Sequence, residues 1–261
     1  MTQTLLLDAY LKRLRLPTVA RLYPQLARDA EASSTTFERF LLALCEAEVA
    51  TRESNVQKDR IKTAKFPFEK DFAEFDFNAI AGLNAQKLLH LAEGEYLARN
   101  ENIVLLGNQG TGKTHMAIAL GRAACRQGKR VAFTTAAGLA NDLAEAQAAY
   151  KLSRLEASLA RVDLLIVDEL GFVPFNATSA QLLFGVLSAR YERGSVIVTT
   201  NKEFGKWTEI FGDEALTGAL LDRLTHHAHI FLANGESYRF KESLQRKEKP
   251  DRQKGEGSKI R

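Results

Sequence analysis

The sequence is poor in cysteine and proline and contains no long apolar run. Its two cysteines, Cys45 and Cys125, fall within helical patterns and have no pairing partner nearby, so the sequence supports neither a disulfide framework nor a zinc module. No apolar stretch approaches the roughly 20 residues that a membrane span requires. The N-terminus, Met1 to Asp8, lacks the basic-then-apolar layout of a secretion signal. We therefore expect a cytoplasmic protein that does not associate with membranes.

The composition is that of a soluble globular protein, with 45% hydrophobic and 26% charged residues among 261. The formal net charge of +4 is unevenly placed, because residues 241–261 alone hold eight basic and four acidic residues. We expect this segment to form a basic tail that is poorly ordered on its own and attracted to polyanions. A solvated tail that only aids solubility is the alternative.

The first 65 or so residues show helical periodicity and no strand-like run. A second short helix is expected to break or restart at Pro24. A third begins at a capping box formed by Thr35 and Glu38. The residues that it is expected to bury are Phe37, Phe40, Leu41 and Leu44. Because Pro67 ends this pattern, the sequence predicts a small helical domain over residues 1–70 that binds DNA or a partner.

Basic residues gather near the end of the third helix, at Lys58, Arg60, Lys62 and Lys65. Three of them, Lys58, Lys62 and Lys65, share one side at helical spacing, where they could contact nucleic-acid phosphates. The alternative is a solvated face that complements the helix dipole. The spacing alone leaves both interpretations open.

From residue 71 onward, short apolar runs alternate with helix-length segments. The candidate strands are Ile103–Leu106, Val131–Thr134, Leu164–Val167, Val196–Thr200 and Ile230–Leu232. Near-continuous apolar strands separated by helices are typical of a parallel sheet covered on both faces. The sequence therefore predicts an α/β domain over residues 71–240, with a five-stranded parallel sheet and flanking helices. Asn234-Gly235 predicts a tight turn that returns Tyr238 and Phe240 antiparallel to the last strand.

Eight consecutive residues directly after the first strand fit a phosphate-binding loop: Gly107, Asn108, Gln109, Gly110, Thr111, Gly112, Lys113 and Thr114. Such a loop must bend tightly and turn its N–H groups toward anionic oxygens, and its glycines allow this because no Cβ obstructs the approach. Lys113 supplies a charge for the outer phosphates, and Thr114 supplies a hydroxyl ligand for Mg²⁺. The following helix points its positive dipole end at the nucleotide. These residues predict binding of ATP or GTP with Mg²⁺.

Polar residues follow two later strands. Asp168 and Glu169 come at the end of an apolar run, so a buried strand delivers two carboxylates to the edge of the sheet where ligands bind. We expect Asp168 to hold Mg²⁺, directly or through water, and Glu169 to polarise the water that attacks the γ-phosphate. Asn201 follows the strand Val196–Thr200 and could orient the same water. The sequence therefore predicts a nucleotide hydrolase.

Together these motifs resemble the IstB/DnaC group of AAA+ ATPases, and within it the IstB transposition helpers. The residues that carry the resemblance are GNQGTGKTH at Gly107 to His115, LLIVDELG at Leu164 to Gly171, VTTN at Val198 to Asn201, LLDRLTHHAHIF at Leu220 to Phe231 and SYRF at Ser237 to Phe240. The resemblance implies an AAA+ core and a helper that forms ATP-dependent homo-oligomers on double-stranded DNA. It further implies that the helper recruits or stimulates a transposase.

The resemblance also assigns roles to single residues. It places His115 with the loop in the nucleotide site, makes Asn201 the polar sensor, and makes Arg223 an arginine finger that enters a neighbour's site. It implies an extra helix between Ala136 and Arg154 that often lines the DNA channel. The basic residues there are Lys151 and Arg154. Too few residues follow the last strand for a C-terminal helical lid, so no lid-borne arginine sensor is assigned.

Several alternatives stay open at this point. A replicative helicase loader would share the ATPase core and use the helical domain to bind a helicase. A small-molecule phosphotransferase would share the phosphate loop, but the sequence shows no second-substrate segment. We do not expect a metal site at His226, His227 and His229, because no cysteine or carboxylate cluster joins them at ligand spacing and neighbouring rings at a strand start point apart. The linker from Phe72 to Leu83 is expected to border the adenine.

Overall fold

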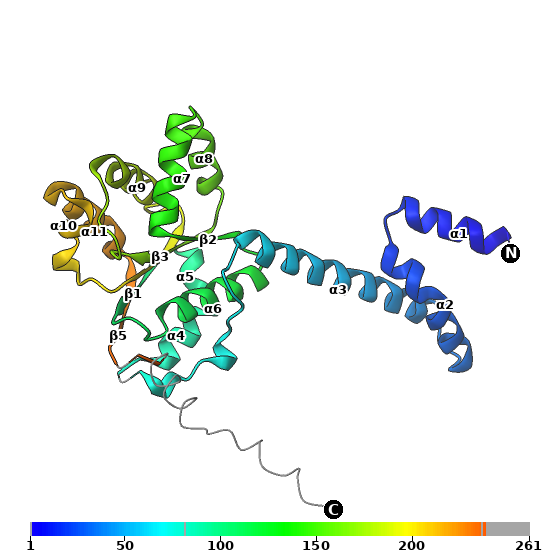
Figure 1. Ribbon diagram of the computed structural model, residues 1–261. Coiled ribbons are helices and arrows are strands. Elements are labelled where there is room, and N and C mark those ends of the chain that lie inside the picture. The colour runs from blue at the N-terminus through cyan, green and yellow to red at the C-terminus, as the bar shows by residue number, and fades with distance from the viewer. Residues whose placement is uncertain (1, 81, 236, 239–261) are drawn as a thin grey trace, which may run out of the picture. The chain divides into compact units, whose positions relative to one another are not determined.

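The structure, a computed structural model, describes residues 2–80, 82–235 and 237–238 (Figure 1). The chain separates into two compact units, Met1–Asp59 and Arg60–Arg261, which are described one at a time. The expected basic tail, residues 241–261, lies outside the described residues, as does Phe240 of the expected hairpin. None of the described helices is long and apolar enough to cross a membrane.

The first unit is helical, as the sequence predicted. It holds α1 (Thr2–Arg13), α2 (Pro17–Ala32) and most of α3 (Phe37–Ala64). The expected break at Pro24 is wrong, because α2 continues through that residue. A proline removes one N–H donor, and a helix that faces solvent on one side can lose one internal bond without ending. Pro17 occupies the first turn, where its missing N–H costs nothing.

Two further expectations for α3 are corrected. The hydroxyl of Thr36, not that of Thr35, accepts the N–H of Arg39 at 3.4 Å, so the helix begins one residue later. Phe37 and Leu41, expected to be buried, are 89% and 60% exposed, since no other described helix of this unit covers the first turns of α3. Farther along, α3 does pack: the carboxylate of Glu48 accepts the N–H groups that open α2. Leu44 is buried, as predicted.

The second unit contains a parallel sheet in the order β2-β3-β4-β1-β5. Its strands are β1 (Asn102–Gly107), β2 (Val131–Thr135), β3 (Leu164–Leu170), β4 (Ser195–Thr200) and β5 (Ala228–Ala233). The five-stranded parallel sheet predicted from the sequence is therefore confirmed. Each strand extends its predicted core by a residue or more, because pairing with neighbours continues beyond the apolar run.

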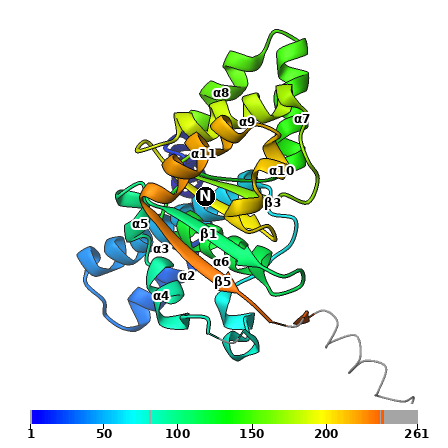
Figure 2. The ribbon, with the colours of Figure 1, turned by 90° about the vertical axis from the view of Figure 1, so that its left-hand side faces the viewer.

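Helices cover both faces of this sheet (Figure 2). One face packs against α6 (Lys113–Arg126), α4 (Ala85–Leu91), α5 (Glu95–Ala98) and the last turn of α3. The other packs against α7 (Ala136–Ala148), α8 (Leu152–Ala160), α9 (Ala177–Ala189), α10 (Thr208–Phe211) and α11 (Glu214–His226). Successive residues of β1 show why: Ile103 belongs to the first core and Val104 to the second. Strands buried on both faces are apolar at every position.

The junctions differ from expectation at two points. The division after Asp59 falls earlier than residue 70, because Ile61 and Ala64 of α3 already belong to the core of the second unit. The predicted antiparallel return after Asn234-Gly235 is wrong for Tyr238. That residue pairs with no strand and instead donates its N–H to the carbonyl of Gly110 at 3.0 Å. The chain after β5 therefore runs to the phosphate loop, where a backbone acceptor is available.

Candidate nucleotide-binding site

The predicted phosphate loop connects β1 to α6 at the carboxyl edge of the sheet. Its backbone has positive φ at Gly107 (153°), Gly110 (76°) and Gly112 (83°), a region that residues with a Cβ rarely adopt. Space is short as well: a Cβ on Gly107 would lie 2.1 Å from the carbonyl oxygen of Ala233. A Cβ on Gly110 would lie 2.1 Å from Oγ of Ser237. Glycine is thus required here by conformation and by close approach.

The loop presents positive charge and backbone donors to its interior. Lys113 donates from Nζ to the carbonyls of Gly107 at 2.8 Å and Asn108 at 2.6 Å, so its ammonium lies across the loop. No side chain caps the start of α6 at Gly112, which leaves the first-turn amides directed along the helix axis into the loop. A helix start of this kind favours an anion such as a phosphate group.

A hydrogen-bonded group of oxygens lies beside the loop. Thr114 donates from its hydroxyl to both carboxylate oxygens of Asp168, at 3.0 and 3.1 Å. Thr199, at the end of β4, donates to Oδ1 of the same carboxylate at 2.5 Å. Asp168 is only 4% exposed, so these two hydroxyls replace the water it gives up. The structure therefore brings together the two residues predicted to hold Mg²⁺.

Glu169 is aimed differently from its neighbour because β3 contains a bulge. The register with β4 shifts between Val167 and Leu170. Glu169 has a φ of 59° and is exposed beside a buried Asp168. A bulge interrupts the regular alternation of a strand, so consecutive side chains can point in directions that a regular strand does not allow. The N–H of Glu169 donates to Oγ1 of Thr199 at 2.9 Å, which fixes the bulge to β4.

The phosphate loop, the start of α6 and the ends of β3 and β4 border one hollow of about 120 Å³. Its lining residues are Gln109, Lys113, Thr114, Glu169, Phe172, Thr199, Thr200 and Asn201. Asn201, predicted as a sensor, thus shares a cavity with the loop lysine and with Glu169. Sequence reasoning missed Thr199 and Phe172. One feature of the sequence could have indicated Thr199. It lies two residues before Asn201, in a predicted strand that ends in two threonines.

A second, more apolar hollow of about 110 Å³ borders the other side of the loop. The linker expected near adenine supplies much of it, in and around two short 3₁₀ turns, η1 (Phe72–Glu74) and η2 (Phe77–Ala79). The Phe75 ring meets His115 edge-on, with centroids 4.9 Å apart. An apolar hollow of this size beside a phosphate loop suits a purine base.

An ion-pair network ties this linker to α6. His115 contacts the carbonyl of Asp71 through Nε2 at 2.9 Å. The Asp71 carboxylate meets Arg126 at 2.5 Å and Arg122 at 3.2 Å. Burial by itself would raise the pKa of Asp71, but the hydrogen bond and charge of Arg126, aided by Arg122, lower it below the ordinary value. The wall of the apolar hollow is therefore fixed to the helix that begins at Lys113.

Other residues predicted from the sequence lie away from this cavity. Arg223 occupies the last turn of α11, where its guanidinium lies 5.5 Å from the ring centroid of Phe184. Since α11 leads into the amino end of β5, this turn lies toward the opposite edge of the sheet from the phosphate loop. The residues predicted to contact DNA, apart from Arg60, are exposed on α3, directly after it and around α8: Lys58, Lys62, Lys65, Lys151 and Arg154. Arg60 packs against Gly128 instead.

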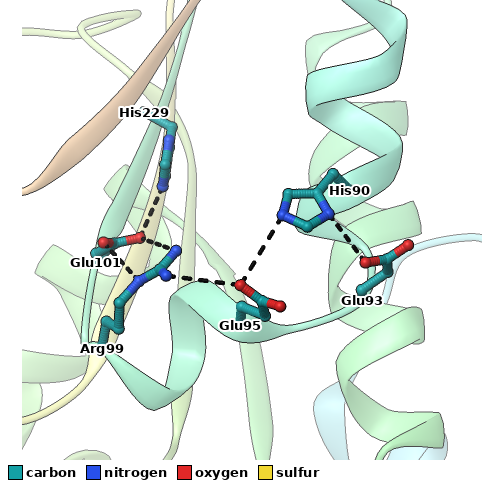
Figure 3. A network of polar contacts seen from close by, with 6 residues as sticks. All are labelled: His90, Glu93, Glu95, Arg99, Glu101 and His229. Carbon is teal, nitrogen blue, oxygen red and sulfur yellow. Dashed lines mark hydrogen bonds and ion pairs between the residues drawn. The ribbon is translucent and has the colours of Figure 1, made fainter.

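The amino edge of the sheet carries a separate polar network (Figure 3). Glu101, just before β1, contacts His229 of β5 at 2.8 Å and Arg99 at 2.8 Å. Burial alone would raise the pKa of Glu101, but hydrogen bonds from His229 and Arg99 lower it. Of the three histidines considered for a metal, His229 is thus occupied by an ion pair. Glu192, which is distant in the sequence, lies beside the other two, His226 and His227.

Comparison with known proteins identifies close relatives. The family model of IstB-like ATP binding proteins matches residues 9–246. The chain is 38% identical, over 92% of its length and 96% of the relative's, to the insertion sequence IS5376 putative ATP-binding protein of Geobacillus stearothermophilus. It is 37% identical, over 90% of its length and 89% of the relative's, to the insertion sequence IS21 putative ATP-binding protein of Pseudomonas aeruginosa.

Solved structures share the fold at lower identity. AMPPCP-bound DnaA from Aquifex aeolicus superimposes with a TM-score of 0.57 at 17% identity, covering 74% of this chain and 58% of that one. DnaI superimposes with a TM-score of 0.53 at 16% identity, covering 65% of this chain and 90% of that one. The P-loop AAA+ fold predicted from the motifs is thereby confirmed.

Proposed function

This chain belongs to the family of IstB-like ATP-binding proteins, and we propose that it is an ATPase that assists transposition of an insertion sequence. In this proposal it binds ATP and Mg²⁺, assembles as a homo-oligomer on double-stranded DNA, and recruits or stimulates a transposase. The names of its relatives as insertion sequence ATP-binding proteins support the association with a mobile element. They also favour this function over a helicase loader with the same core.

The observation that carries the proposal is the cavity shared by Lys113, Glu169 and Asn201. Lys113 would neutralise the outer phosphates, and Asn201 would position the γ-phosphate or the attacking water. The exposed carboxylate of Glu169 would accept a proton from that water, a role that requires a base within hydrogen-bond reach. A hydrolase needs these three groups on one face of the triphosphate, and separate strand ends supply them here.

The residues at the end of β3 and the start of α6 fit a bound Mg²⁺. Thr114 and Asp168 offer a hydroxyl and a carboxylate within 3.1 Å of each other, and hard divalent ions prefer oxygen ligands of this kind. Thr199 keeps the carboxylate in one orientation from the opposite side. When bound, the ion would neutralise charge on the β- and γ-phosphates.

The base would occupy the slot formed by Phe75, Ala79 and Ile80 against the loop. Its apolar side chains would contact the base. Because Tyr238 is fixed to Gly110 by a backbone hydrogen bond, the segment after β5 would move with the loop. This arrangement supports ATP as the ligand and links its binding to the chain beyond the sheet.

Assembly and DNA binding complete the proposal. Arg223 lies on a surface away from its own chain's phosphate loop, which suits a residue that completes the site of a neighbouring copy. Exposed basic residues on α3 and α8 would neutralise DNA phosphates. Each phosphate contact releases counterions, so DNA binding should weaken steeply as salt is raised.

The proposal can be tested with the full chain and three single variants. We expect DNA-stimulated ATP hydrolysis and a nucleotide-dependent increase in size by light scattering. Lys113→Ala should abolish both, and Arg223→Ala should abolish hydrolysis without loss of ATP binding. Lys129→Ala, which removes a lysine from the turn after the other end of α6, is the matched control and should leave both unchanged.

Two results would contradict the proposal. One is DNA binding and particle size that do not respond to ATP. The other is hydrolysis by Arg223→Ala at the unmodified rate, which would exclude the role in a neighbouring site. Capture assays then separate the two candidate partners, since a helper should retain the transposase encoded beside it and a loader should retain a replicative helicase.

A further inference from the structure

Three side chains that could bind a metal ion gather where α11 meets β5. Glu192 lies in the turn between α9 and β4, His226 ends α11, and His227 follows it. One ligand atom from each lies within 4.8 Å of the others, and all three residues are exposed. The two imidazole rings are 4.0 Å apart between centroids, inclined at 54°. Residues distant in the sequence thus form a two-nitrogen, one-carboxylate group.

The backbone explains why neighbouring histidines face the same way. His227 has left the helical region, with φ of −126° and ψ of 74°, so its ring does not follow the helical rotation from His226. It has not yet entered β5 either, where alternation would point it to the opposite face. Its carbonyl accepts the N–H of Asn102 at 2.7 Å. The helix-to-strand junction therefore holds both rings on one side.

The turn that carries Glu192 is held by a separate set of contacts. The carbonyl of Glu192 accepts a hydrogen bond from the side chain of Asn100 at 3.0 Å, which fixes the turn against the segment before β1. The adjacent Tyr191 hydroxyl lies 2.8 Å from Nδ1 of His226. Metal-binding histidines characteristically make a hydrogen bond through the nitrogen that faces away from the ion. The same hydroxyl interacts with the carboxylate of Glu192, so Tyr191 connects two of the three proposed ligands.

We propose that Glu192, His226 and His227 form a binding site for a divalent transition-metal ion, with Zn²⁺ as the best match. Imidazole nitrogen selects zinc, copper and nickel over the hard ions Mg²⁺ and Ca²⁺, which prefer oxygen. Three protein ligands leave one tetrahedral position for water. Ligand atoms about 2.1 Å from a tetrahedral zinc ion lie roughly 3.4 Å from one another. Separations of up to 4.8 Å must therefore close by up to about 1.4 Å, which exposed side chains can do by rotation.

The other three of the chain's five histidines are engaged elsewhere. His115 contacts the carbonyl of Asp71, and His229 pairs with Glu101 beside Arg99. His90 does have two carboxylates near it, but Figure 3 shows them at opposite ring nitrogens. One ion cannot use both of these carboxylates together with the ring. Among the described residues, only Glu192, His226 and His227 converge as a group of three.

An ion at this site would connect α11 to the turn after α9. Arg223 lies one helical turn before His226 on α11. Metal binding would therefore restrain the helix end that carries the proposed arginine finger. This consequence depends on the function proposed above, whereas the binding site itself does not.

The test uses the full chain without a polyhistidine tag, stripped of metal by a chelator and then dialysed. Titration with Zn²⁺, followed by calorimetry, should show one ion per chain at micromolar concentration. His227→Ala and Glu192→Gln should each weaken binding by about tenfold or more. His90→Ala, which removes an exposed histidine with neighbouring carboxylates, is the matched control and should bind as the unmodified chain does.

Cobalt(II) substitution identifies the ligands. Its spectrum should lack the near-ultraviolet thiolate charge-transfer bands that exposed Cys45 would produce, and His227→Ala should change its visible bands. The proposal is overturned if the stripped chain takes up no Zn²⁺ at micromolar concentration. It is equally overturned if both folded variants, checked by circular dichroism, bind as tightly as the control. Neither result would bear on ATP hydrolysis, which is measured separately.

Discussion

Thr199→Val removes the hydroxyl that joins the two carboxylate residues of β3 while keeping the volume of the side chain. In the structure this hydroxyl donates to Asp168 at 2.5 Å and accepts the N–H of Glu169 at 2.9 Å. Thr199 is 1% exposed, so water cannot take its place at the carboxylate. The substitution should therefore loosen the orientation of Asp168 and the bulge that aims Glu169.

The size of the effect follows from the bonds that are lost. A hydrogen bond to a charged group contributes about 1.5–3 kcal/mol, and an amide left without a partner adds to the loss. The Glu169 amide is only partly buried, so we expect a total of about 2–3 kcal/mol in the free energy of unfolding. That corresponds to a fall in Tm of roughly 5–10 °C for a domain of this size. If about 2 kcal/mol is also lost from the transition state, kcat falls roughly 30-fold.

The assay is steady-state ATP hydrolysis with DNA present, at a temperature where every variant is folded. We expect kcat to fall with little change in KM for ATP, and the Mg²⁺ concentration needed for half-maximal rate to rise. Thr199→Ser should restore most of the rate because it keeps the hydroxyl. Thr217→Val is the matched control, since Thr217 is also buried but its hydroxyl donates to the carbonyl of Asp213, outside the cavity. Equal kcat values for Thr199→Val and Thr217→Val would refute the reasoning.

Three further predictions test other parts of the site. Glu169→Gln should lower hydrolysis by about 10²-fold or more while ATP binding persists, and equal turnover would exclude it as the general base. Gly110→Ala should abolish binding of a fluorescent ATP analogue, since its Cβ meets Ser237 and its φ is positive, whereas Gly205→Ala faces open space and should bind normally. Because the pKa of Asp71 is lowered in the folded state, its stabilisation is present above about pH 4 and lost below it. The difference in urea unfolding free energy between the unmodified chain and Asp71→Asn should therefore shrink as pH falls from about 5 to 3, and a constant difference would contradict the ion pair.

Local patterns were sufficient for the parts of the fold that depend on near neighbours in the chain. The glycine spacing of the phosphate loop predicted its conformation because φ is decided within each residue. The apolar runs predicted the strands because a strand buried on both faces must be apolar throughout. By contrast, Pro24 and Phe37 were misjudged, since exposure to solvent decided those positions.

Contacts between distant segments had to come from the tertiary structure. The sequence alone predicted three apolar strands and the polar group at the end of each. These groups are the phosphate loop, the Asp168-Glu169 pair and Asn201. Only the packing of β3 beside β4 showed that Thr199 joins Asp168 to Glu169, because a bulge shifts the register between those strands. Only the turn after α9 brought Glu192 to His226 and His227. Residue types specify what a side chain can bind, but the pairing of remote segments decides which side chains meet.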